Sequence, residues 1–147
     1  MVVRLGRSIA SDKNFAFQHD WLVTNGLGGY ASGSLSGART RRYHSLLTVA
    51  NSSPFQRFLL VAAADIWVKI GDRRVPLTTH DWAAGIVLPD GYRNLERFTL
   101  EGTIPVFHWT VGEVCIEQRI WMAHGQNTTY ITWQYQRGTT PIKLYIK

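Results

Sequence analysis

The chain has little cysteine and no long apolar run. Its 147 residues include a single cysteine, Cys115, which excludes an internal disulfide framework and a Cys-x-x-Cys zinc module. No apolar run approaches the roughly 18–20 residues of a membrane span. Residues 1–12 also lack the apolar stretch of about 7–15 residues that a secretory signal carries. We therefore expect a cytoplasmic protein with no membrane partner, in which Cys115 is a small buried side chain.

Charge of either sign is modest and scattered. Lys and Arg number 16 against 10 Asp and Glu, a formal net charge of +6, which permits an anionic partner without requiring one. The sequence has no block of five like charges and no RRM, KH or zinc-finger motif, so nucleic-acid binding is the weakest of the functions considered. The five histidines show no metal-ligand spacing. We expect no nucleic-acid partner, no metal and no cofactor.

The clearest patterns that are present are β-hairpins. Residues 107–111 and 114–121 alternate around Gly112-Glu113, and residues 66–70 and 73–77 repeat this design around Gly71-Asp72. A Gly-X pair between alternating runs is typical of a two-residue turn, because Gly accepts a positive φ. Pro76 lacks an N–H, which predicts an edge position for its strand.

The rest of the chain also favours strands. Further strands are predicted at 42–50, 58–64, 130–136 and 142–147, with a turn at 89–91. No window of about 11 residues carries the apolar stripe of a helix. Residues 1–147 are therefore predicted to form one all-β domain, an antiparallel β-sandwich of about 8–10 short strands. The last strand pattern runs to the end of the chain, which suggests a truncated sandwich whose exposed edge favours pairing with another chain, as in a homodimer.

Aromatic residues make up 12% of the chain, which indicates either an aromatic core or rings exposed for binding. Those in alternating strands are expected to pack in the core or between domains: Trp67, Trp109, Trp121 and Trp133. Those near predicted loops are the better candidates for stacking on a sugar: Trp21, Tyr30, Trp82 and Tyr92.

A glycine-rich segment begins at Trp21. Five glycines fall between Gly26 and Gly37, and such a loop persists where the backbone turns sharply or approaches something closely. The segment is not a nucleotide-binding loop, because it lacks the strand-to-helix context and the Gly-Lys-Ser/Thr of a phosphate loop. A tight loop packed against its own sheet is an equally good interpretation.

The segment Thr40-Arg41-Arg42-Tyr43-His44 follows this loop. In a strand, Arg41 and Tyr43 share one face and Arg42 and His44 the other. Arginine donors, a tyrosine ring and a histidine with two switchable nitrogens suit the hydroxyls and the C–H face of a sugar. A solvated face with one arginine in a salt bridge is the alternative.

The runs Asp20–Gly33 and Thr40–Leu47 resemble the N-terminal domain of bacterial and archaeal glycogen debranching enzymes of the amylo-α-1,6-glucosidase type. Residues 89–98, 104–107 and 122–129 fit the same family in the same order. Asp20 stands where the family has Glu, and Ser45 where it has Gly. The resemblance implies a β-sandwich of the supersandwich type, longer than these residues, followed by a catalytic (α/α)-barrel that they do not include.

The resemblance further implies that the domain contributes to α-glucan binding and supports that barrel in glycogen breakdown. No catalytic residue is expected in this chain, because the family's catalytic carboxylates belong to the barrel and the carboxylates here show no evident pairing. The implied partners are glycogen or a maltooligosaccharide and the barrel domain. The alternative is a purely structural module with no ligand of its own. The predicted substrate-binding residues are Trp21, Asn25, Gly28, Gly29, Tyr30, Arg41, Arg42, Tyr43 and His44.

Overall fold

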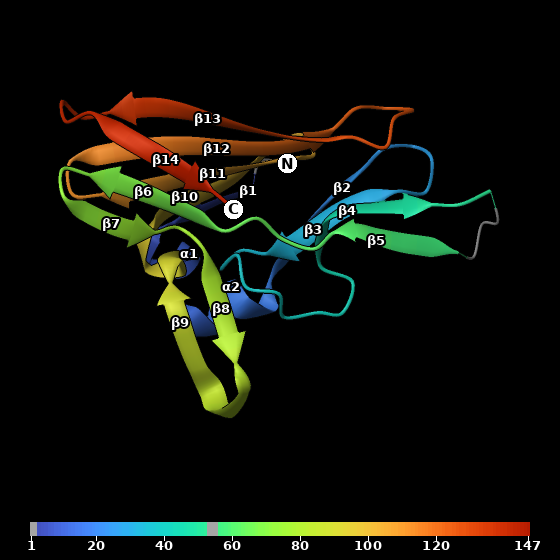
Figure 1. Cartoon of the computed structure of the whole chain (residues 1–147), viewed down its shortest axis with the longest axis horizontal. Coiled ribbons are helices and arrows are strands. Elements are labelled where there is room, and N and C mark those ends of the chain that lie inside the picture. The colour runs from blue at the N-terminus through green and yellow to red at the C-terminus, as the bar shows by residue number, and fades with distance from the viewer. Residues whose placement is uncertain (1–2, 53–55) are drawn as a thin grey trace.

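The computed structural model describes residues 3–52 and 56–147, and strands dominate it (Figure 1). The strands are β1 (Val3–Gly6), β2 (Asp20–Thr24), β3 (Tyr30–Ser34), β4 (Ser45–Ala50), β5 (Arg57–Val61), β6 (Ile66–Ile70), β7 (Arg73–Pro76), β8 (Thr79–Trp82), β9 (Ile86–Asp90), β10 (Leu95–Glu101), β11 (Ile104–Val111), β12 (Val114–Met122), β13 (Thr129–Arg137) and β14 (Ile142–Ile146). The helical elements are α1 (Arg7–Ala10), α2 (Lys13–Gln18) and the 3₁₀ turns η1 (Ala83–Gly85) and η2 (Gly91–Asn94).

Three sheets pack around one core. The largest has five antiparallel strands in the order β1-β10-β11-β12-β13. A four-stranded sheet, β2-β3-β4-β5, and a three-stranded sheet, β14-β6-β7, pack against it. Buried side chains of all three sheets, among them Phe107, Trp21 and Val68, form one apolar cluster. The predicted all-β antiparallel sandwich is confirmed.

The predicted hairpins form as the alternation and the glycines require. Val111 pairs with Val114 across the Gly112-Glu113 turn, and Ile70 pairs with Arg73 across the Gly71-Asp72 turn. Gly112 and Gly71 have φ values of 59° and 56°, the left-handed conformation that side chains with a Cβ disfavour.

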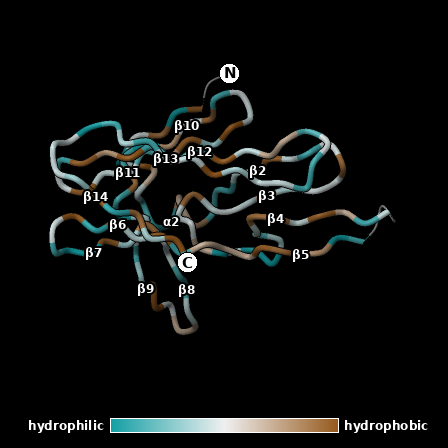
Figure 2. The backbone as a smooth tube through the Cα atoms, turned by 45° about the horizontal axis from the view of Figure 1, so that its top comes forward, coloured by the Kyte–Doolittle hydropathy of each residue, from teal (hydrophilic) through white to brown (hydrophobic). Residues whose placement is uncertain are grey.

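The edges of the sheets follow the sequence as well. Pro76 ends β7, which is an edge strand of its sheet as predicted. At the other edge of this sheet, β14 pairs with β6 from Ile142–Ile70 to Ile146–Ile66. The hairpin formed by β8 and β9 projects from the body of the molecule (Figures 1 and 2).

Several boundaries differ from the prediction. The described residues contain fourteen strands rather than 8–10. They also contain helices α1 and α2, of four and six residues, which are too short to show an apolar stripe. Asp12 caps α2 by accepting a 2.8 Å hydrogen bond from the N–H of Phe15. β5 ends at Val61, and Pro89 and Asp90 belong to β9 rather than to the turn, which starts at Gly91.

The strand predicted for residues 42–50 begins only at Ser45. Residues 41–44 form a turn, in which the N–H of His44 donates a 3.2 Å hydrogen bond to the carbonyl of Arg41. The expected alternation of Arg41 and Tyr43 with Arg42 and His44 across a strand is therefore wrong.

The aromatic side chains divide between core and surface. Trp109 is buried and Trp133 packs against the core cluster, as expected. Trp67 and Trp121 alternate with buried neighbours and point outward, so of the two expected positions packing between domains is the one left for them. Tyr92 is buried and is no stacking platform, whereas Trp82 is exposed. Cys115 is buried, as expected.

The helices described here are short. Within residues 3–52 and 56–147, no helix has the length and apolarity that crossing a membrane requires.

Candidate functional site

A groove of about 710 Å³ lies on the four-stranded sheet, on the face turned away from the core. Alternation along β2 creates this face, because Trp21 and Val23 are buried while Leu22 and Thr24 are exposed. The lining includes five of the residues predicted to bind substrate: Trp21, Gly28, Gly29, Tyr30 and Tyr43. The groove is the place where the glycine-rich loop and the Arg41–His44 turn meet.

Two tyrosine rings and two charged groups give this groove its chemistry. Tyr43 is half-exposed, and its hydroxyl donates a 3.1 Å hydrogen bond to Oδ2 of Asp20. Tyr30 is partly buried opposite Thr24. Arg57 of β5 donates from Nε to the carbonyl of Gly28 at 2.9 Å. The groove thus offers aromatic surface, a carboxylate and a guanidinium side by side, a combination that binds hydroxyl-rich ligands.

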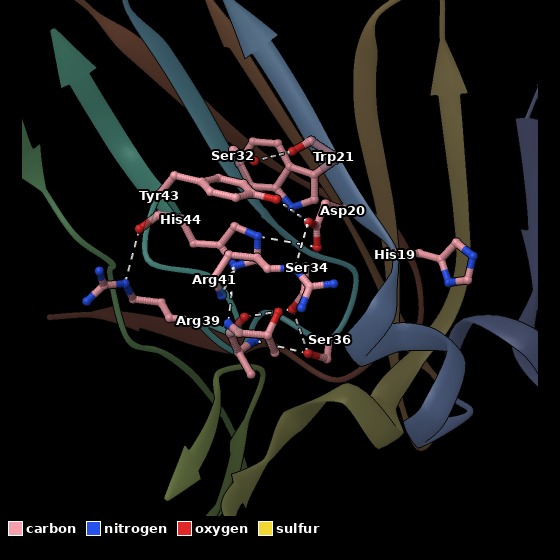
Figure 3. A network of polar contacts seen from close by, with 12 residues as sticks. His19, Asp20, Trp21, Ser32, Ser34, Ser36, Arg39, Arg41, Tyr43 and His44 are labelled. Atoms are coloured by element: carbon pink, nitrogen blue, oxygen red, sulfur yellow. Dashed lines mark hydrogen bonds and ion pairs between the residues drawn. The ribbon is translucent and has the colours of Figure 1, made fainter. Parts of the chain in front are cut away.

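Asp20 organises the Arg41–His44 turn from across the sheet (Figure 3). Its Oδ2 lies 3.6 Å from Nε of Arg41, and its Oδ1 lies 3.3 Å from Nε2 of His44. The Tyr43 ring stands edge-on to the His44 ring, with 5.2 Å between their centroids. Three of the predicted residues therefore converge on one carboxylate, which fixes the Tyr43 ring at the edge of the groove.

His44 supports this arrangement from inside. It is only 1% exposed. Its Nδ1 accepts hydrogen bonds from the backbone N–H groups of Thr40, at 3.2 Å, and Arg41, at 3.3 Å. Because Nδ1 is the acceptor, the ring proton of the neutral form resides on Nε2, which faces Asp20. His44 is thus placed to hold the turn rather than to contact a ligand.

Asn25 joins the glycine-rich loop to the distant β12–β13 turn. The side chain is fully buried. Its Oδ1 accepts from the N–H groups of Leu27, at 2.9 Å, and Gly29, at 3.0 Å. Its Nδ2 donates to the Gln126 carbonyl, at 3.0 Å, and to Oδ1 of Asn127, at 2.8 Å. All four hydrogen-bonding positions of the amide are filled by the protein, so Asn25 has none left for a substrate.

The glycines of the loop accommodate close internal contacts. A Cβ on Gly29 would lie 2.7 Å from Nδ2 of Asn25 and 2.9 Å from the Thr48 carbonyl, and one on Gly26 would collide with the His124 ring. Gly26 and Gly28 also have positive φ values of 77° and 84°. The interpretation of a tight loop packed on its own sheet therefore accounts for these glycines, all three of which also border the groove.

Trp21 borders the groove with its ring turned into the core, and Arg42 lies outside the groove lining. Trp21 is in β2, and its ring packs edge-on against Phe107 in the core, so the expectation that it stacks on a sugar is wrong. It also borders a small cavity of about 90 Å³ inside the sandwich. Arg42 is exposed in the turn beside Tyr43 but is not part of the groove lining.

Sequence reasoning missed six residues of the groove lining: Asp20, Leu22, Thr24, Gly26, Ser32 and Arg57. The alternation around Trp21 and Val23 contained the signal for Asp20, Leu22 and Thr24. Arg57 had no such signal, because its position depends on the pairing of β5 with β4.

The comparisons with known proteins give one match. A family model described as "Glycogen debranching enzyme N terminal" matches residues 19–147. No curated protein and no solved structure matches the chain.

Proposed function

The chain belongs to the family of glycogen debranching enzyme N-terminal domains, and from this premise we propose that it is a non-catalytic domain which contacts α-glucan through the groove on the four-stranded sheet. We also propose that it supports the (α/α)-barrel glycoside hydrolase domain of such an enzyme during glycogen breakdown in the cytoplasm. The observation that carries the proposal is that two motifs, the glycine-rich loop and the Arg41–His44 turn, build one groove with exposed aromatic and polar groups.

The chemistry of this groove suits a neutral sugar chain. A pyranose presents an apolar C–H face and a rim of hydroxyls, so it binds where a ring lies beside donors and acceptors. Tyr43 supplies an exposed ring held by Asp20, and Arg57 supplies a donor at the groove wall. We assign Arg41 and Arg42, both exposed in the adjoining turn, as donors at the rim.

The other predicted residues act through these contacts rather than by touching sugar. Asn25 and His44 are buried and hold the loop and the turn. Trp21 forms the floor, with its ring in the core. Gly28 and Gly29 let the backbone of the loop pass close to its neighbours.

We expect no hydrolase activity from this chain. Glycoside hydrolysis normally needs two carboxyl groups about 5–9.5 Å apart on either side of the scissile bond. Asp20 is the carboxylate in the groove lining, and it is engaged by Arg41, Tyr43 and His44. A single carboxylate held in this way positions side chains and leaves the acid–base pair to another domain.

Support for a catalytic barrel is proposed from the apolar surface that the fold leaves bare. Phe58 and Leu60 of β5 are 50% and 60% exposed, although they belong to a regular strand. Trp82, Ile86 and Leu88 on the β8–β9 hairpin are more than half exposed. Exposed apolar side chains that are grouped in this way are typical of surfaces buried against another domain.

A second candidate is a purely structural module. It is favoured by the complete satisfaction of Asn25 and by the internal contacts of the loop glycines. In that case the motifs build the fold and the domain interface, and the groove takes no ligand.

A titration with maltooligosaccharides, followed by tryptophan fluorescence, tests the glucan contact. Tyr43→Ala is expected to weaken binding about two- to tenfold, the size of one lost aromatic contact, while the melting temperature changes little. Tyr135→Ala is the matched control, because Tyr135 is similarly exposed but lies on β13, outside the groove lining. Absence of binding by the native chain, together with a lower melting temperature for Tyr43→Ala, would favour the structural module.

A further inference from the structure

The outward face of the five-stranded sheet carries a second aromatic platform. Trp121 on β12 pairs with Tyr130 on β13, so both side chains project from the same side. Their rings are stacked, with centroids 5.4 Å apart and an interplanar angle of 14°. Tyr130 is 43% exposed although its strand lies within a regular sheet. Since core residues such as Ile120 and Ile131 alternate with this pair, the stack lies on the side away from the groove.

A row of polar side chains continues from the stacked pair across the same face. Glu117 lies at its centre: Oε1 accepts from Nε of Arg119 at 2.6 Å, and Oε2 accepts from the Gln136 amide at 3.2 Å. Nε2 of His108 lies 3.2 Å from the same Oε2. Arg119 also reaches Glu101 on β10. The row thus crosses four strands. Glu117 and His108 are buried within it, and the guanidinium of Arg119, the amide of Gln136 and the carboxylate of Glu101 lie at its surface.

Two nearly buried side chains of this region carry polar atoms with no partner among the described residues. These atoms are Nδ1 of His108 and Oγ1 of Thr99, and both residues are more than nine-tenths buried. Burial, and next the nearby Arg97, lower the pKa of His108. The ring is therefore neutral near pH 7, and Nδ1 carries no proton. Burying such atoms without a partner is costly, so the sheet directly beneath the row is polar and incompletely hydrogen-bonded.

The charges of the face favour a neutral ligand. Arg119 is paired with both Glu101 and Glu117, so within the row one cation meets two carboxylates and no positive charge is left over. A nucleic acid or another polyanion needs uncompensated Lys and Arg in a row. A polyhydroxylated chain needs mixed donors and acceptors beside an aromatic surface, which is what this face provides.

We propose that the outward face of the five-stranded sheet is a second α-glucan-binding surface, with the Trp121–Tyr130 stack as its platform and the Glu117 row as its hydrogen-bonding edge. The choice of polymer rests on the proposed function, but the site shares no residue with the groove. Two surfaces on different sheets allow one branched glucan to be held at two points, which raises the overall affinity through effective concentration.

Retention of the chain by glycogen in affinity gel electrophoresis tests the surface. Tyr130→Ala is expected to weaken retention about two- to tenfold. Tyr135→Ala is the control, because it removes the same side chain from the same strand at a similar exposure, 41%, on the opposite side. Thr132→Glu, an exposed position beside Arg119, places a bulky charge on the surface without removing a core contact, and it is expected to weaken retention as well.

The outcomes separate this inference from the groove. Loss of retention by Tyr130→Ala and Thr132→Glu, with Tyr135→Ala like the native chain and all melting temperatures similar, supports the second surface. Native retention by both face variants overturns it, and so does an equal loss by Tyr135→Ala. If Tyr43→Ala alone loses binding, the groove stands and the second surface fails. If the face variants alone lose binding, the groove fails.

Discussion

Replacing Asn25 by alanine removes a single buried amide that connects two segments about a hundred positions apart. The amide receives the N–H groups of Leu27 and Gly29 and donates to Gln126 and Asn127. The Asn25 carbonyl, which the substitution keeps, also accepts the N–H of Gly125 at 2.7 Å. Asn25→Ala therefore removes the four side-chain hydrogen bonds of this junction and keeps the backbone one. The substitution tests what these four bonds contribute to stability.

The magnitude follows from which partners water can reach. Gly29 is buried, so its N–H loses its only side-chain partner without gaining a solvent one, at a cost of about 1–3 kcal/mol. Leu27, Gln126 and Asn127 are exposed and regain water, so each lost bond costs only about 0.5–1 kcal/mol. We expect Asn25→Ala to lower the free energy of unfolding by about 3–5 kcal/mol, a large share of a typical domain's stability.

Urea denaturation followed by fluorescence measures this loss. Asn14→Ala is the control, because Asn14 is exposed on α2, and it is expected to change the free energy of unfolding by less than about 0.5 kcal/mol. Asn25→Asp keeps the acceptor for the loop but turns a second acceptor toward the Gln126 carbonyl and buries a carboxylate, so it is expected to destabilise the chain as well. A free energy for Asn25→Ala within about 1 kcal/mol of the control refutes the reasoning, because it leaves the four bonds without net effect.

Two further predictions concern Gly26 and His108. Gly26→Ala is expected to destabilise the chain by more than Gly125→Ala, because both glycines have φ near 75° but of the two only Gly26 faces a ring, that of His124. Urea unfolding of both variants measures the difference. Adding His124→Ala to Gly26→Ala should remove the extra loss in the free energy of unfolding. The pKa of His108 in the folded chain is below its usual 6.5, chiefly through burial, so the unfolded state takes up the proton first as the pH falls. The free energy of unfolding is therefore full above about pH 6.5 and declines below it. Urea unfolding between about pH 8 and 5 should show a smaller decline for His108→Gln than for the native chain. An equal decline in both would assign the effect to other groups.

Much of the fold could be predicted because its signals are local. Strict alternation around Gly112 and around Gly71 identifies a strand, a turn and a register together, since shifting either strand by one residue would turn its apolar face outward. Alternation also separates the two faces of β13, on which Ile131 and Trp133 face the core and Tyr130 and Thr132 do not. The pairing of β1 with β10, by contrast, joins residues more than ninety positions apart, and no local pattern contains it.

The sequence predicts which residues belong to the candidate site better than it predicts how they are arranged. Residues 41–44 have the composition of a strand, yet Asp20 on β2 draws Arg41, Tyr43 and His44 to one carboxylate and the chain turns instead. These contacts join residues more than twenty positions apart. The local pattern of residues 41–44 therefore contains no sign of the turn that the contacts impose. The same applies to Arg57, which reaches the Gly28 carbonyl only because β5 pairs with β4.

The junction at Asn25 explains why the sequence motifs contain so many residues that cannot touch a ligand. Composition identifies the glycine-rich loop and the family resemblance identifies residues 122–129, and the structure brings the two together through Asn25, Gly26 and His124. A groove that binds sugar through a half-exposed ring needs that ring held within about 0.5 Å of its position. Tyr43 is held by Asp20, Asp20 is fixed in β2, and β2 leads directly into the loop that Asn25 fastens. The position of the exposed Tyr43 ring thus depends on residues that are themselves buried. A substitution at Asn25 should therefore weaken glucan binding, although the Asn25 side chain does not contact the glucan.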